Sequence, residues 1–124
     1  SADLHSANLR SANLHSANLH SADLRYADLH SADLDDIRLW SATGNMGEIK
    51  TLAIDTWAVV YTERYLQIGC ERYDIADWWG FEDKRIKQMD TRALDWWLKW
   101  KDFIRQAVEM APATPTGRKE SSDE

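Results

Sequence analysis

The sequence predicts a mainly β protein, in which a repetitive solenoid is followed by a small α+β module. Three observations support this fold class. Residues 1–43 open with eight consecutive five-residue units, and each unit carries an aliphatic side chain at its second and fourth positions. Residues 44–111 instead contain short β-rich runs and one long amphipathic segment. Residues 112–124 contain both prolines and many charges, so we expect a flexible tail.

The five-residue period is the feature that predicts the solenoid. A period of five matches neither the 3.6 residues of a helical turn nor the two-residue alternation of a strand. Because no single unit can bury its own apolar side chains, the units must coil and stack around a shared core. The period ends at Gly44, which stands where the next leucine is due. The predicted core consists of the fourth-position leucines: Leu4, Leu9, Leu14, Leu19, Leu24, Leu29, Leu34 and Leu39.

The run of Ala-Asp-Leu and Ala-Asn-Leu units resembles the pentapeptide-repeat family. The resemblance implies a right-handed, four-sided β-helix with four units per coil, so that residues 1–40 would form about two coils. It also implies that second- and fourth-position side chains point inward, while fifth-position side chains face solvent. With twenty residues per coil, His15 is expected to stack over Asp35 and His20 over Trp40. Two coils leave open ends, so we expect further coils before Ser1 or pairing of identical edges between two chains.

The pattern beyond Gly44 predicts a β-meander followed by helices. Residues 48–54 and 57–62 are β-rich runs that read as a hairpin, and residues 65–70 form a third run. Helical structure is expected over residues 74–79 and 82–89, and Asp90 is expected to cap a long helix over residues 91–110. The tryptophans predicted to fill the core are Trp57, Trp78, Trp79, Trp97 and Trp100, with Trp40 as a lid on the last coil.

Residues 44–110 are similar to a small C-terminal module of pentapeptide-repeat proteins from phages and prophages. The segments that carry this resemblance are GNMGEIK, VVYTERYLQIGCER and MDTRALDWWLKWK. We expect the module to cap the solenoid and to join two chains into a homodimer through an aromatic stripe on the long helix. The residues expected at that contact are Trp96, Phe103 and Met110.

Charge and cysteine content restrict the class of protein. The 124 residues carry a net charge of −6, which argues against nonspecific nucleic-acid binding. The single cysteine, Cys70, excludes an internal disulfide framework and suits a reducing cytoplasm. Because Cys70 follows an apolar run, we expect its side chain to be buried. No apolar run reaches transmembrane length, so we predict no membrane contact.

The residue patterns predict neither catalysis nor a metal or other cofactor. No histidine follows His30, so Cys70 lacks the neighbouring base that activates a thiol. Neither a phosphate-binding glycine loop nor a Ser-His-Asp pattern is found. All four histidines lie at fifth positions of the units and belong to different sides of the coil, whereas a metal needs converging ligands. We therefore do not expect an enzyme.

The predicted function is a noncatalytic protein-binding or structural module in the cytoplasm. The candidate binding face is made of His5, Arg10, His15, His20, Arg25 and His30. An alternative comes from the family, some of whose members mimic duplex DNA and inhibit DNA gyrase or another topoisomerase. The six Asp and three Arg of residues 1–40 amount to only −3, which disfavours such mimicry. A further alternative, based on the phage resemblance, is a counter-defence inhibitor of a host protein or signal.

Overall fold

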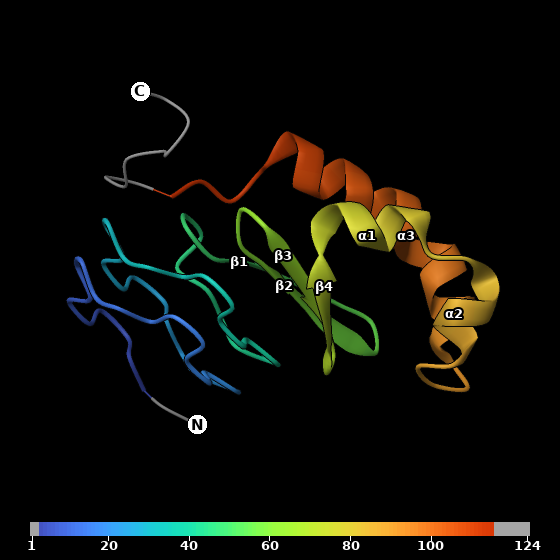
Figure 1. The fold of residues 1–124 in the computed structure, drawn as a ribbon, viewed down its shortest axis with the longest axis horizontal. Helices are drawn as coiled ribbons and strands as arrows, with labels where there is room; N and C mark the ends of the chain where they lie inside the picture. Colours follow the sequence, from blue (N-terminus) through green and yellow to red (C-terminus); the bar gives the residue numbers. More distant parts are fainter. Residues whose placement is uncertain (1–2, 116–124) are drawn as a thin grey trace.

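The molecule is built in three layers, which are the solenoid, a β-sheet and a group of helices (Figure 1). The fold is that of a computed structural model, which describes residues 3–115 apart from the side chain of Ile54. The sheet lies between the solenoid and the helices, and it is therefore the layer that contacts both.

The corners of the solenoid are made by a turn that recurs every five residues. The first residue of each unit from Ser6 to Ser41 has a positive φ of 57° to 63°. In the corner that follows Leu24, the Asp23 side chain accepts the Arg25 N–H at 3.1 Å, and the Ala27 N–H donates to the Leu24 carbonyl at 3.0 Å. Asp and Asn favour such local side-chain to backbone bonds. The third residue, which is Asp or Asn in the first seven units, therefore helps to form the corner of its own unit.

Successive coils pair residues that lie twenty positions apart. Parallel bridges join Asp3 to Asp23 and Asp23 to Thr43, and equivalent bridges recur at each unit between them. This spacing is the one expected from four units per coil. It places the His20 ring 4.4 Å from the Trp40 ring, as predicted.

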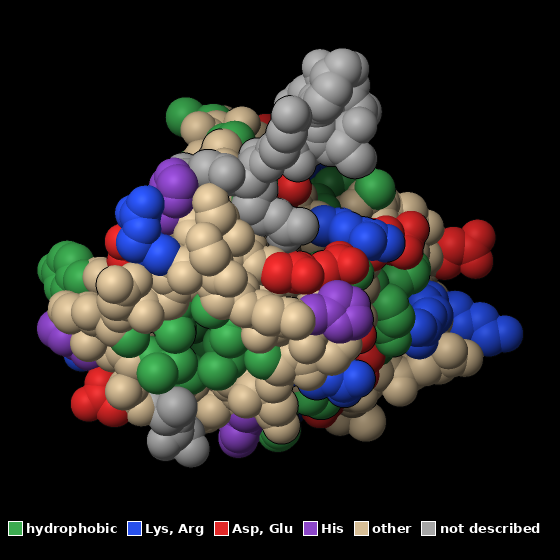
Figure 2. Space-filling view, turned by 60° about the vertical axis from the view of Figure 1, so that its left-hand side comes forward, with side chains coloured by type: hydrophobic (Ala, Val, Ile, Leu, Met, Phe, Trp, Pro, Cys, Tyr) green, Lys and Arg blue, Asp and Glu red, His purple; other side chains and the backbone are tan. Residues whose placement is uncertain are grey.

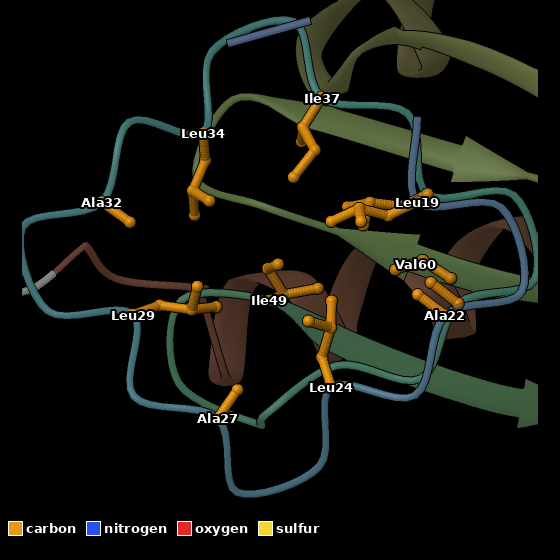
Figure 3. Close-up of a cluster of buried hydrophobic side chains, with 12 residues drawn as sticks. Leu19, Ala22, Leu24, Ala27, Leu29, Ala32, Leu34, Ile37, Ile49 and Val60 are labelled. Carbon is orange, nitrogen blue, oxygen red and sulfur yellow. The ribbon is translucent and has the colours of Figure 1, made fainter. Parts of the chain in front are cut away.

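The second- and fourth-position side chains form the solenoid core (Figure 3). Leu24 and Leu29 are fully buried, and the fourth-position leucines from Leu19 to Leu39 all belong to this core. Leu4, Leu9 and Leu14 are only partly buried, because no described residue stacks on their side of the first coil. Hydrophobic side chains consequently gather on this end of the solenoid (Figure 2).

The strands form one antiparallel sheet in the order β1-β2-β3-β4. The predicted hairpin is confirmed, because Ile54 pairs with Trp57 across a two-residue turn in which Asp55 has a φ of 56°. The fourth strand was not predicted, since its polar sequence lacks an apolar alternation; it follows a turn at Gly69 and Cys70. The strands are β1 (Lys50–Ile54), β2 (Trp57–Tyr61), β3 (Tyr65–Ile68) and β4 (Glu71–Asp74).

Three helices cover the face of the sheet that points away from the solenoid (Figure 1). They are α1 (Ile75–Gly80), α2 (Asp83–Lys87) and α3 (Ala93–Met110). The long helix begins two residues later than predicted. The predicted Asp90 cap is therefore wrong, since Arg92 occupies the N-cap position. Asp90 lies in the turn before the helix, where its Oδ1 atom accepts the Arg92 N–H at 2.8 Å.

One cross-strand row of the sheet faces the solenoid. The row consists of Thr51, Val60, Gln67 and Arg72, which are paired neighbours across the four strands. Val60 is buried within the leucine core (Figure 3). Since side chains alternate between the two faces of a strand, the flanking β2 and β3 residues point to the helices instead.

The polar members of this row bond to backbone groups at the end of the last coil. The three bonds run from the Leu39 N–H to Gln67 Oε1 at 2.9 Å, from Thr51 Oγ1 to the Ala42 carbonyl at 3.3 Å, and from Arg72 Nη1 to the Ile37 carbonyl at 3.5 Å. One level earlier, the matching Leu19 N–H donates to the next coil at the Arg38 carbonyl. Side chains of the sheet therefore form the hydrogen bonds that the backbone of a further coil would form. In this way they seal the open backbone edge of the last coil.

The core between sheet and helices is rich in aromatic rings, and all five tryptophans predicted for it contribute to it, to different degrees. Trp78 and Trp97 are buried as predicted, whereas Trp57, Trp79 and Trp100 are only partly buried. Trp96, which was not predicted for this core, is buried in it as well. Trp40 is not a lid on the last coil, because 44% of its surface is exposed. Cys70 is exposed as well, since it lies in the β3–β4 turn rather than in the strand.

The described residues after α3 pack against the module. Ala113 is buried in the helix-side core, and the Thr114 N–H donates to the Gly47 carbonyl at 3.2 Å. The Tyr61 hydroxyl donates to the Ala111 carbonyl at 2.7 Å. A flexible tail was predicted from residue 112 onward. These contacts instead hold its first four residues, 112–115, in place, and the rest of the tail lies outside the described residues.

Candidate functional site

The six residues proposed as a solenoid binding face do not form one continuous surface. Inward side chains of successive units enter the core from different sides of the coil (Figure 3). The fifth-position side chains, which alternate with them, consequently leave the coil on different sides. His5 contacts Tyr26, Arg10 contacts Asp28 and His15 lies 4.0 Å from Asp35, so each has its own neighbours.

Arginines pair with several of the aspartates on the outside of the solenoid. Arg25 binds both carboxylate oxygens of Asp23, at 3.0 and 2.9 Å, and these hydrogen bonds lower the pKa of Asp23 to about 2. Further pairs are Arg10 with Asp28 at 3.3 Å, Arg64 with Asp35 at 3.4 Å and Arg72 with Asp36 at 2.7 Å. The negative charge of the solenoid is thus locally balanced.

A polar cleft lies where one side of the solenoid meets the β3–β4 hairpin. We call it the seam cleft, and it has a volume of about 460 Å³. The solenoid contributes His20, Arg38 and Trp40, and the hairpin contributes Gln67, Glu71 and Arg72 among its walls. Of the residues predicted for the binding face, only His20 lines this cleft.

Hydrogen-bond donors outnumber acceptors in the seam cleft. The Arg38 guanidinium is exposed and makes no hydrogen bond or ion pair with another described residue. Arg72 is held by the Asp36 carboxylate and the Ile37 carbonyl. Glu71 is the one carboxylate among the described residues that line the cleft, and it accepts the Tyr73 hydroxyl at 3.1 Å.

The stripe predicted for dimer contact is only partly available. Trp96 is 7% exposed, because the Trp57 ring from the β1–β2 hairpin packs edge-on against it at 5.4 Å. The expected exposed contact at Trp96 is therefore wrong. Phe103 and Met110 lie beyond this cover, and their exposed fractions are 48% and 77%.

The described part of the chain contains no group of three or more His, Cys, Asp or Glu side chains placed to hold a metal ion. Within the solenoid, the histidines lie at the fifth positions of their units, so those of neighbouring units leave the coil on different sides. Within residues 3–115, no helix is long and apolar enough to cross a membrane.

Comparison with known families concerns the repetitive part of the chain. The family model "Pentapeptide repeats" matches residues 2–40 with eight copies. Residues 2–40 belong to the pentapeptide-repeat family. The pentapeptide-repeat segment ends just before the register fails at Gly44, where the fold changes from coil to sheet. No curated protein and no solved structure matches the chain significantly.

Sequence reasoning missed most of the seam cleft because its two walls are far apart in the chain. Arg38 lies in the last pentapeptide repeat, whereas Gln67 and Arg72 lie on β3 and β4. One signal was available at Gln67, a polar residue between Leu66 and Ile68. In a strand with apolar neighbours on one face, that pattern indicates a side chain directed to the opposite face.

Proposed function

We propose that this chain is a noncatalytic binding module, in which a right-handed, four-sided pentapeptide-repeat β-helix presents fixed polar rows to a protein partner. The observation that carries the proposal is the sealed end of the solenoid. Because Gln67, Thr51 and Arg72 bond to the last coil, the repeats and the α+β module act as one rigid body. Rigid, preordered surfaces lose little conformational freedom on binding.

The binding function is tested with tagged full-length chain in bacterial lysate. We expect one protein to be captured and then lost when Arg10 and Arg25 are both changed to Glu, since both side chains are more than half exposed. The matched control changes Lys84 and Lys87 on α2 to Glu. Both side chains are exposed, and α2 lies apart from the repeats. Capture that is equal for both double variants would contradict a binding surface on the solenoid.

We also propose that the chain forms a homodimer through Phe103 and Met110 on α3. These side chains lie on one stripe of the helix, and their apolar surface is exposed in a single chain. Changing both to Ser should convert the dimer to a monomer in light scattering, with the melting temperature of the monomeric fold retained. The control is Leu98→Ser, because Leu98 is 59% exposed on a different side of the helix. A monomeric wild type at all concentrations would refute the dimer.

Gyrase inhibition by DNA mimicry is not expected for this chain. Duplex DNA presents regular, unpaired negative charge, whereas Asp23 and Asp28 are each bound by an arginine. Supercoiling assays at low salt should therefore show no inhibition. Potent inhibition that disappears when these two aspartates are changed to Asn would replace the binding proposal with the mimicry alternative, because that contact would be electrostatic.

A further inference from the structure

The wall of the seam cleft contains an amide donor that has no acceptor among the described residues. Gln67 is only 6% exposed, and its Oε1 atom is occupied by the Leu39 N–H at 2.9 Å. This bond fixes which end of the amide is the oxygen, because a backbone N–H can only donate. The remaining Nε2 group has two N–H bonds and no acceptor among the described residues, and Gln67 is part of the cleft wall.

The charges around Gln67 favour an anion as the missing acceptor. The Arg38 guanidinium makes no hydrogen bond or ion pair with a described residue, although it lies in the field of Asp36, and Arg72 adds a second guanidinium that is only partly used by Asp36. Guanidinium groups bind phosphate and carboxylate oxygens through strong, directional hydrogen bonds. A phosphate group placed between Arg38 and Gln67 would meet donors from both walls of the cleft.

The remaining walls fit a nucleoside rather than a simple anion. The Trp40 ring is 44% exposed, and the His20 ring packs 4.4 Å behind it at a tilt of 43°. An exposed, supported indole offers a flat surface on which a planar base stacks. The carboxylate of Glu71 is the group that can accept ribose hydroxyls in a cleft otherwise rich in donors. The volume of about 460 Å³ lies in the usual range of small-ligand sites, roughly 300–1,000 Å³.

We propose that the seam cleft binds a nucleoside monophosphate, with its phosphate on Arg38 and Gln67 and its base on Trp40. This site shares only His20 with the predicted binding face of the solenoid, and it shares no residue with the dimer contact on α3. Its residues come from the last coil and from the hairpin that seals it, so it exists only in the assembled fold.

The first experiment is calorimetric titration of the full-length chain with AMP, GMP, CMP and UMP. We expect saturable binding of at least one of them. The nucleoside that corresponds to this nucleotide, ribose 5-phosphate and inorganic phosphate should each bind at least tenfold more weakly. Each of them lacks the phosphate or the base that the cleft is proposed to recognise. Absence of saturable binding by all four nucleotides would overturn the proposal, and so would equally tight binding of inorganic phosphate.

Three variants test the assigned contacts. Gln67→Glu keeps an oxygen for the Leu39 N–H but replaces the donor with negative charge, so affinity should fall at least tenfold. Arg38→Gln removes an exposed guanidinium that makes no internal hydrogen bond, and it should weaken phosphate-dependent binding to a similar degree without altering the melting temperature. Trp40→Ala should also weaken binding, whereas Trp40→Phe should retain most of it.

The matched control is Arg105→Gln on α3, because Arg105 is exposed, pairs with Glu109 and lies outside the cleft. It should bind as wild type does. If Gln67→Glu lowers the melting temperature, Arg38→Gln remains decisive, because it does not change the hydrogen bond between Gln67 and the Leu39 N–H. Nucleotide binding that is unchanged by Arg38→Gln would refute the assignment to this cleft, even if the protein partner of the solenoid were found.

Discussion

Replacing Leu24 with Asp is expected to unfold the solenoid at room temperature. Leu24 is fully buried between neighbouring leucines of the narrow core. Deleting a buried leucine side chain costs about 2–5 kcal/mol, and an unpaired carboxylate in its place adds a desolvation cost. That loss is a large part of the roughly 5–15 kcal/mol that stabilises a typical domain. Thermal and urea unfolding followed by circular dichroism measures the effect.

The matched control for this substitution is Tyr26→Asp, two residues away in the same coil. Tyr26 is 77% exposed, and its φ of 62° is a conformation that Asp adopts more readily than most residues. The same conformation is found at Asp36, two units further along the chain. We expect the stability of this variant to stay within about 0.5 kcal/mol of wild type. Similar losses for both substitutions would overturn the inward and outward assignment.

Gly44→Ala should destabilise the junction between the solenoid and the sheet. A Cβ atom at Gly44 would lie 2.2 Å from the Ile49 carbonyl oxygen and 2.7 Å from Ile49 Cγ2. The obstacle is backbone, so it cannot be relieved by a change of rotamer. Ile49 is fully buried in the solenoid core, and the Gly44 N–H bonds to Thr51 Oγ1 at 2.9 Å. Overpacking of this kind costs about 1–3 kcal/mol or more.

The control for Gly44 is the same exchange at Gly80, the last residue of α1. A Cβ atom there meets nothing within 4 Å. Since Ala has the higher helix propensity, Gly80→Ala should leave stability unchanged or raise it by up to about 1 kcal/mol. The two variants are compared by chemical denaturation. A Gly44→Ala protein as stable as Gly80→Ala would show that the junction is more adaptable than its geometry indicates.

The junction also explains how one end of the repeat is covered. A solenoid exposes unpaired backbone groups and apolar side chains at each end of its stack, and capping elements usually cover them. Here a sheet covers the end of the last coil, and it does so with side chains rather than with backbone groups. Val60 packs into the solenoid core, and Gln67 accepts a hydrogen bond from the Leu39 N–H. The module was expected to cap the solenoid, and these contacts are the ones through which it does so.

The sequence by itself determined the features that depend on local or periodic interactions. The stacking of the units around a shared core follows from the pentapeptide period, because no unit can bury its own Leu and Ala, whereas the twenty-residue coil was implied by the family resemblance. The β1–β2 hairpin follows from two β-rich runs around Asp55, a residue that tolerates a positive φ. Such features need only neighbouring residues or an exact repeat.

Only the tertiary structure decided which surfaces remain open. Trp96 and Phe103 share one stripe of α3, yet Trp57 packs over the first, whereas the second remains 48% exposed. The helical pattern cannot distinguish them, because cover depends on where a distant hairpin ends. The seam cleft has the same origin: Arg38 and Gln67 are brought to it by docking of the sheet onto the last coil, which no period in the sequence encodes.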